Sequence, residues 1–141
     1  MSESFHNLEN SLEGDLYTDK KHRLLYATDA SAYREIPAAV ARPKNAGDIK
    51  KLIQFANKES FSLIPRTAGT SLAGQVVGGG IVADVSKYMT GILELNTEEN
   101  WVRVQPAVIL DELNLFFFFF VLFFGPETST SNRCMIGGMV G

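Results

Sequence analysis

The chain has 141 residues, a formal net charge of −3 and 45% hydrophobic residues. This length and composition are those of one ordinary soluble domain or a large part of one. The mild acidity argues against the basic surface that nucleic-acid-binding proteins usually carry, so we expect no nucleic-acid partner.

Metal and disulfide chemistry have little support in the sequence. Cys134 is the single cysteine, so no disulfide can form within the chain, which fits a reducing compartment. His6 and His22 lack the spacing of metal ligands, and no metal site is expected. The opening residues lack the basic and apolar regions of a secretory signal. We expect a cytoplasmic protein, with peripheral attachment to the inner membrane as the alternative.

The first elements are predicted from spacing. Phe5, Leu8 and Leu12 recur three and four residues apart, which predicts a short amphipathic helix that stops at Gly14. Residues 22–37 have no clean period and predict mostly loop.

The next segments predict a strand and a well-capped helix. Residues 38–43 predict a strand that ends at a proline. Asn45 can cap a helix over 46–58, with Asp48 in its first turn, where the helix dipole favours a carboxylate. The expected buried stripe of this helix consists of Ile49, Leu52, Ile53 and Ala56.

The second half of the chain predicts four strands and a further helix. The expected strands are 61–65, 81–86, 91–96 and 101–106, and the expected helix is 108–116. The order of elements predicts an α+β fold and not a uniform βαβ repeat.

Glycine-rich stretches raise the question of nucleotide binding. Gly78, Gly80 and Ala83 match the dinucleotide fingerprint, but a strand-like segment follows where that fingerprint requires a helix. We reject that site, and no G-K-[ST] phosphate loop exists in the chain.

Two other small-residue stretches are more informative. Residues 65–75 follow a strand, and their backbone N–H groups can converge on a diphosphate without a helix. The alternative is a long surface loop. A second stretch, 126–141, suggests one extended ligand held from two sides. Neither stretch pairs a nucleophile with a base, so the chemistry would lie in the ligand.

Four segments taken together carry a family resemblance: 27–37, 41–56, 64–75 and 125–141. They resemble FAD-linked oxidases of the vanillyl-alcohol-oxidase or p-cresol methylhydroxylase (PCMH) type, in the glycolate oxidase and D-lactate dehydrogenase branch. The resemblance implies an FAD-binding domain of two α+β subdomains over 35–141, incomplete at its C-terminal end. Residues 1–34 would form an N-terminal extension, and the separate substrate domain would be absent from this fragment.

The resemblance also implies the residues that hold FAD. One wall would come from the diphosphate loop, from Gly74 and Gln75, and from Pro106. The loop residues are Arg66, Thr67, Ala68, Gly69, Thr70 and Ser71. The other wall would come from Pro126, Thr128, Ser129, Cys134, Ile136, Gly137, Gly138 and Gly141. No catalytic residue is assigned to this chain.

The expected binding of FAD is non-covalent. Relatives that attach FAD through a histidine carry it where this chain has Thr70. A threonine hydroxyl is a poor nucleophile without an activating base. Cys134 is the one thiol that some relatives would use, but a free cysteine is more often a small buried apolar residue.

The function implied is that of a flavin-dependent 2-hydroxy-acid dehydrogenase of the D-lactate or glycolate type. Its substrate would be a small 2-hydroxy acid bound by the missing domain, and its electron acceptor an iron–sulfur domain, a quinone or another carrier. Two alternatives stay open: an inactive or FAD-binding-only remnant, and an FAD reductase of cell-wall precursor synthesis that shares the fold.

A run of nine apolar residues, 116–124, departs from the family pattern. It is about half the length of a membrane-spanning helix. Phe118, Phe119, Phe120 and Val121 stand where relatives have a lysine, proline, histidine and glycine turn. A helix-to-strand reversal favours glycine or proline. We expect a corrupted segment, with a buried strand as second choice and a membrane contact as third.

Overall fold

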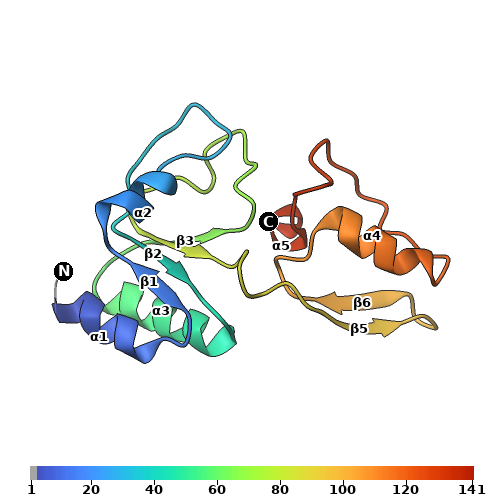
Figure 1. Ribbon diagram of the computed structural model, residues 1–141, viewed down its shortest axis with the longest axis horizontal. Helices are drawn as coiled ribbons and strands as arrows, with labels where there is room; N and C mark the ends of the chain where they lie inside the picture. Colours follow the sequence, from blue (N-terminus) through green and yellow to red (C-terminus); the bar gives the residue numbers. More distant parts are fainter. Residues whose placement is uncertain (1–2) are drawn as a thin grey trace.

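The computed structural model describes residues 3–141 and consists of two α+β units (Figure 1). The helices are α1 Glu3–Ser11, α2 Lys20–Leu25, α3 Ala46–Lys58, α4 Leu110–Phe118 and α5 Ile136–Val140. The strands are β1 Asp15–Tyr17, β2 Ala39–Arg42, β3 Leu63–Arg66, β4 Ile81–Asp84, β5 Ile92–Asn96 and β6 Trp101–Val104. The predicted α+β class with two subdomains is confirmed.

The first unit is a four-stranded sheet in the order β1-β2-β4-β3. The strands β2, β4 and β3 run parallel, and β1 is antiparallel to β2. Helices α1 and α3 cover one face of the sheet, while α2 and two long loops lie on the other side (Figure 1). The carboxyl ends of the parallel strands therefore meet at one edge, where open α/β sheets bind ligands.

Side chains alternate between the two faces of β2, as a strand requires. Ala39 and Ala41 join the core beneath α1 and α3, while Val40 joins Tyr26 and Val82 on the opposite face. All of these residues are at most 9% exposed. The sheet is thus buried on both sides, which explains why β2 and β4 read as continuous apolar runs.

Helix α3 has the predicted bounds, and its cap is the predicted one. The Asn45 side chain accepts a hydrogen bond from the Asp48 amide at 3.0 Å. Its buried stripe differs from the prediction, because Ile53 is 54% exposed. The fully buried Asp48 carboxylate accepts hydrogen bonds from the Glu13, Gly14 and Lys44 amides. A polar hub that ties three segments together therefore occupies part of this helix face.

The structure also contains a helix that the sequence prediction missed. Residues 20–25, in a segment expected to be loop from 22 onward, form α2. The Asp19 side chain accepts from the His22 amide at 3.1 Å and caps the helix. No residue of α2 is buried, so the helix has no apolar stripe that could have marked it.

The second unit packs α4 and α5 against the antiparallel hairpin β5-β6. Its core contains Val108, Leu110, Leu113, Phe117, Cys134 and Ile136. In Figure 1, α5 lies on the side of this unit that faces the first one. Among residues 3–141, no helix combines the length and apolar character needed to span a bilayer.

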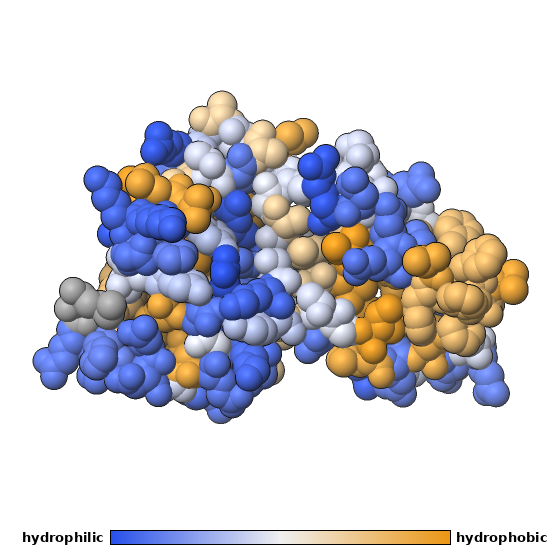
Figure 2. All heavy atoms as spheres, viewed as in Figure 1, coloured by the Kyte–Doolittle hydropathy of each residue, from blue (hydrophilic) through white to orange (hydrophobic). Residues whose placement is uncertain are grey.

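The phenylalanine run does not form a strand, so the buried-strand alternative is wrong. Its first residues complete α4, and a turn with no further regular element follows. Phe117 is buried, whereas Phe118, Phe119, Val121 and Phe123 are at least 75% exposed. Figure 2 shows the resulting apolar end of the molecule, over α4 and the turn after it.

Candidate functional site

The loop after β3 contains the first predicted wall of the site. Arg66 ends β3, and Gly69 has a left-handed backbone with φ of +69°. Within residues 3–141, the N–H groups of Thr67, Ala68, Gly69 and Thr70 have no hydrogen-bond acceptor. Unbonded amides on a short turn at the end of a parallel strand are the arrangement that binds an anion.

The rest of this loop is held by the Ser71 side chain and by a contact with Tyr33. The Ser71 hydroxyl accepts from the amides of Ala73 and Gln75 and donates to the Gln75 side chain. Gly74 has φ of +76° and packs on the Tyr33 ring, which a side chain at this position would meet at 2.7 Å. Ser71 and Gly74 therefore fix the shape of the loop.

The second predicted wall reaches the first through the glycines of α5. A side chain at Gly138 would lie 2.7 Å from the Thr67 hydroxyl, and one at Gly137 would lie 2.5 Å from Pro106 Cβ. The Gly137 amide also donates to the Pro106 carbonyl at 2.8 Å. Residues about 30 to 70 positions apart are therefore brought together, and the close approach requires glycine.

Of the other predicted site residues, some are exposed to solvent and others are buried in the core of the second unit. Pro126, Thr128 and Ser129 are exposed. Cys134 and Ile136 are buried in the core of the second unit, with the Cys134 thiol between the Thr128 hydroxyl at 3.0 Å and the Met139 sulfur at 3.7 Å. Cys134 thus has the predicted character of a small buried residue.

A polar cluster lies beside the Arg66 loop. The Tyr26 hydroxyl donates to Asp84 Oδ2 at 2.5 Å and accepts from Arg42 Nη2 at 2.8 Å. Arg42 and Asp84 also form an ion pair at 3.5 Å. Burial, and then the hydrogen bond to Asp84, raise the pKa of Tyr26, so its hydroxyl stays protonated. The sequence prediction missed this cluster, and no local spacing pattern marks it.

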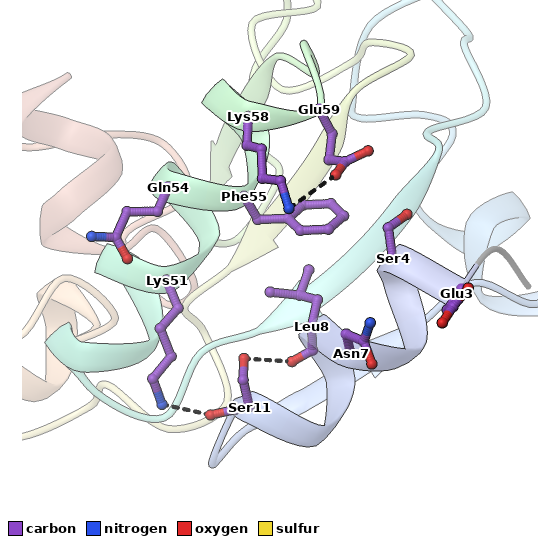
Figure 3. Close-up of a pocket in the computed structure, with 10 residues that line it drawn as sticks. All are labelled: Glu3, Ser4, Asn7, Leu8, Ser11, Lys51, Gln54, Phe55, Lys58 and Glu59. Atoms are coloured by element: carbon purple, nitrogen blue, oxygen red, sulfur yellow. Dashed lines mark hydrogen bonds and ion pairs between the residues drawn. The ribbon is translucent and has the colours of Figure 1, made fainter.

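Described residues also line two surface cavities. An open cavity of about 240 Å³ lies beside the loop, lined by Tyr33, Arg34, Glu35, Ala73, Gly74 and Val77. A larger groove of about 430 Å³ lies away from it, between α1 and α3 (Figure 3). In that groove Lys51 donates to the Ser11 carbonyl and Lys58 pairs with Glu59. Its cations already have protein partners, so we assign it no ligand.

Comparison with known proteins identifies the domain. A family model described as an FAD binding domain matches residues 37–141. The chain belongs to this FAD binding domain family. The residues present fit the cofactor, because the unbonded amides of residues 67–70 lie on the loop that Gly138 contacts through Thr67.

Two curated relatives indicate the branch of the family. D-2-hydroxyglutarate dehydrogenase of Haemophilus influenzae is 47% identical over 131 residues, which is 91% of this chain and 13% of the relative. The glycolate oxidase subunit GlcD of Bacillus subtilis is 32% identical over 121 residues, or 84% of this chain and 26% of the relative. The chain thus spans a small part of the relatives it matches.

Solved structures confirm the fold. Alkyldihydroxyacetonephosphate synthase superposes with a TM-score of 0.83 at 18% identity, over 96% of this chain and 28% of that one. p-Cresol methylhydroxylase superposes with a TM-score of 0.67 at 13% identity, over 83% of this chain and 25% of that one. The predicted PCMH-type fold is confirmed, and at these identities the likeness concerns the fold alone.

Proposed function

We propose that the chain is the FAD-binding portion of a flavin-dependent dehydrogenase that oxidises a small D-2-hydroxy acid. The observation that carries the proposal is the meeting of Thr67 and Gly138, which joins the unbonded amides of one segment to the glycines of the other. The 47% identity to a D-2-hydroxyglutarate dehydrogenase supports that acid as the first substrate to test, ahead of D-lactate and glycolate.

The proposed roles of the residues follow from their positions. The amides of Thr67 to Thr70 would bind the diphosphate, and Arg66 would supply positive charge. Gly137 and Gly138 would keep the second segment in close contact with Pro106 and Thr67, beside that loop. Bound FAD would supply the acceptor for the hydride that leaves the substrate α-carbon. The described residues of the site pair no base with a nucleophile, so the proposal assigns this chain cofactor binding alone.

We further propose that FAD is held without a covalent bond. His22 lies on α2, where its ring stacks on Tyr17 at 3.9 Å and bonds Asp19, and His6 lies on α1. Cys134 is 5% exposed. The loop carries Thr70 instead of histidine, which leaves no activated nucleophile there. Acid precipitation of the loaded protein should release flavin to the supernatant, whereas a fluorescent pellet would contradict the proposal.

The function is tested with the complete product of the gene. After FAD loading, anaerobic addition of D-2-hydroxyglutarate should bleach the visible flavin absorbance, and D-lactate and glycolate should be tried in parallel. L-2-hydroxyglutarate and L-lactate are the controls for the two chiral acids and should leave the flavin oxidised. A folded, flavin-loaded protein that no 2-hydroxy acid reduces would contradict the dehydrogenase assignment.

A second candidate is an FAD-binding remnant without activity. The exposed phenylalanines and the left-handed Val121 favour this candidate. An exposed apolar patch promotes aggregation, and a positive φ strains the backbone of a β-branched residue. Stable FAD binding without reduction by any 2-hydroxy acid is the outcome that would support it.

A further inference from the structure

The guanidinium of Arg66 is held over an aromatic ring from outside the matched family domain. Its Cζ atom lies 5.2 Å from the centroid of Tyr26, and its Nη1 donates to the Thr28 carbonyl at 2.9 Å. Both partners precede residue 37, where the family match begins. A cation over a ring and a directed hydrogen bond together restrict an otherwise flexible side chain.

Tyr26 is itself fixed in place. The residue is 9% exposed, and its hydroxyl lies between the Asp84 carboxylate and the Arg42 guanidinium. Asp84 is 4% exposed and lies at the end of β4, next to Arg66 in the strand register. A buried hydroxyl with a donor on one side and an acceptor on the other has little freedom to turn. The ring that faces Arg66 is therefore rigid.

The guanidinium lies against the turn that carries the unbonded amides. A side chain at Gly69 would meet Arg66 Nη2 at 2.5 Å. Asp29 is the acidic neighbour. Burial raises its pKa, but hydrogen bonding from Ser31, the nearby Ser71 hydroxyl and the charge of Arg66 outweigh burial and lower that pKa. The contacts described for Arg66 engage one of its five N–H groups.

We propose that Tyr26 is a positioning residue for the cofactor, because its ring fixes the Arg66 cation beside Gly69, where it binds the diphosphate together with the loop amides. The inference rests on the proposed function, since it takes the diphosphate of FAD as the ligand. It assigns a binding role to residues 26–28, which precede the family match.

The test compares two ligands in the complete gene product. Tyr26→Leu removes the ring and should weaken FAD binding by about tenfold, the factor that corresponds to ~1.4 kcal/mol. Binding of riboflavin, which lacks the diphosphate, should change less than about twofold, well below that factor. Tyr26→Phe keeps the ring but loses the hydroxyl that anchors it, so its FAD affinity should lie between those of the wild type and Tyr26→Leu. An equal loss for both ligands would show a merely structural role and overturn the proposal.

A matched control and a second variant make the outcome decisive. Tyr88 also has a cation over its ring, Lys87 at 4.6 Å, and its hydroxyl bonds Asp15. Tyr88→Leu should leave FAD affinity unchanged. Arg66→Lys keeps the charge but loses the stacked, forked geometry, and should weaken FAD binding as Tyr26→Leu does. This variant decides the question if Tyr26→Leu fails to fold, and wild-type affinity in it would overturn the proposal.

The two proposals fail in different ways. A folded wild-type protein that binds no FAD would contradict the proposed function. A wild-type protein that binds FAD, with unchanged affinity in folded Tyr26→Leu, would contradict only the role of Tyr26.

Discussion

The turn after α4 places a valine where a glycine belongs. The Val121 amide donates to the Phe118 carbonyl and the Leu122 amide to the Phe117 carbonyl, which is the hydrogen-bond pattern of a Schellman helix end. Val121 occupies the left-handed position of this motif, with φ of +58°. We predict that Val121→Gly stabilises the protein.

The magnitude follows from two opposing terms. A left-handed backbone costs an L-residue about 1–2 kcal/mol, and β-branched valine is among the least suited to it. Glycine gains more freedom in the unfolded chain, which offsets roughly 0.5–1 kcal/mol of this. Val121 is 94% exposed, so its removal loses almost no packing. The net gain should be about 1 kcal/mol, or an increase in Tm of about 3–5 °C.

Urea unfolding of the chain measures this free energy directly. Val140→Gly is the control, since Val140 is 80% exposed and has no positive φ. That variant should gain nothing. Val121→Asn should gain less than Val121→Gly, because asparagine tolerates the left-handed region better than valine. A Val121→Gly protein no more stable than the wild type would refute the left-handed turn.

Three further predictions concern the site, the hub and the apolar end. Gly69→Val should weaken FAD binding by about tenfold or more, because its side chain would strike Arg66 on a left-handed backbone. Asp48→Asn should destabilise the fold by about 2 kcal/mol at neutral pH through lost charge-assisted hydrogen bonds. Changing Phe118 and Phe119 together to serine should reduce self-association, seen as a shift to monomer in size-exclusion chromatography.

The pH dependence of the Asp48 effect has a definite sign. Burial raises the pKa of this carboxyl, but the hydrogen bonds from Lys44, Glu13 and Gly14 and the charge of Lys51 outweigh burial and lower it. A lowered folded-state pKa contributes stability that is present above the unfolded value of about 3.9 and lost as pH falls through the folded value. The difference between wild type and Asp48→Asn should therefore shrink below about pH 4. A difference that grows on acidification would contradict the hub.

Controls separate these effects from general damage. A side chain at Gly125 would meet only Phe123, at an ordinary 3.6 Å, so Gly125→Val should leave FAD binding intact. An equal loss of FAD affinity in Gly125→Val and Gly69→Val would contradict the loop assignment.

The control for the apolar end is Phe117, which is buried. Phe117→Ser should unfold the second unit, whereas the exposed Phe118 and Phe119 can be changed without unfolding it. Unchanged self-association in the double serine variant would show that the apolar end does not cause it.

Elements with strong local signals could be predicted from the sequence. Helix α3 begins after Asn45 as expected, because its cap and its first-turn Asp48 are local features. Helix α2 has a cap at Asp19 but no apolar stripe, so periodicity alone could not find it. Ile53 was expected to be buried, but the buried residues of α3 are Asp48, Leu52 and Ala56. Asp48 is held there by amides more than 30 residues away, which local spacing cannot reveal.

The sequence predicts which two segments form the candidate site. It does not predict the distant residues that support those segments. The two small-residue stretches predict one ligand held from two sides, and Thr67 and Gly138, one from each stretch, meet in the structure. The ring of Tyr26 beneath Arg66 joins residues 40 positions apart, and no periodic pattern encodes such a contact. The binding roles of the individual residues stay predictions until FAD itself is measured.

The central claim is that two distant segments form one FAD site, and a titration of FAD into the complete gene product tests it most directly. Flavin fluorescence should be quenched at a one-to-one stoichiometry. Gly69→Val and Gly138→Val, which alter the two segments separately, should each weaken the binding while the protein stays folded. Wild-type protein that is folded but binds no FAD, or binding that neither substitution weakens, would contradict the account.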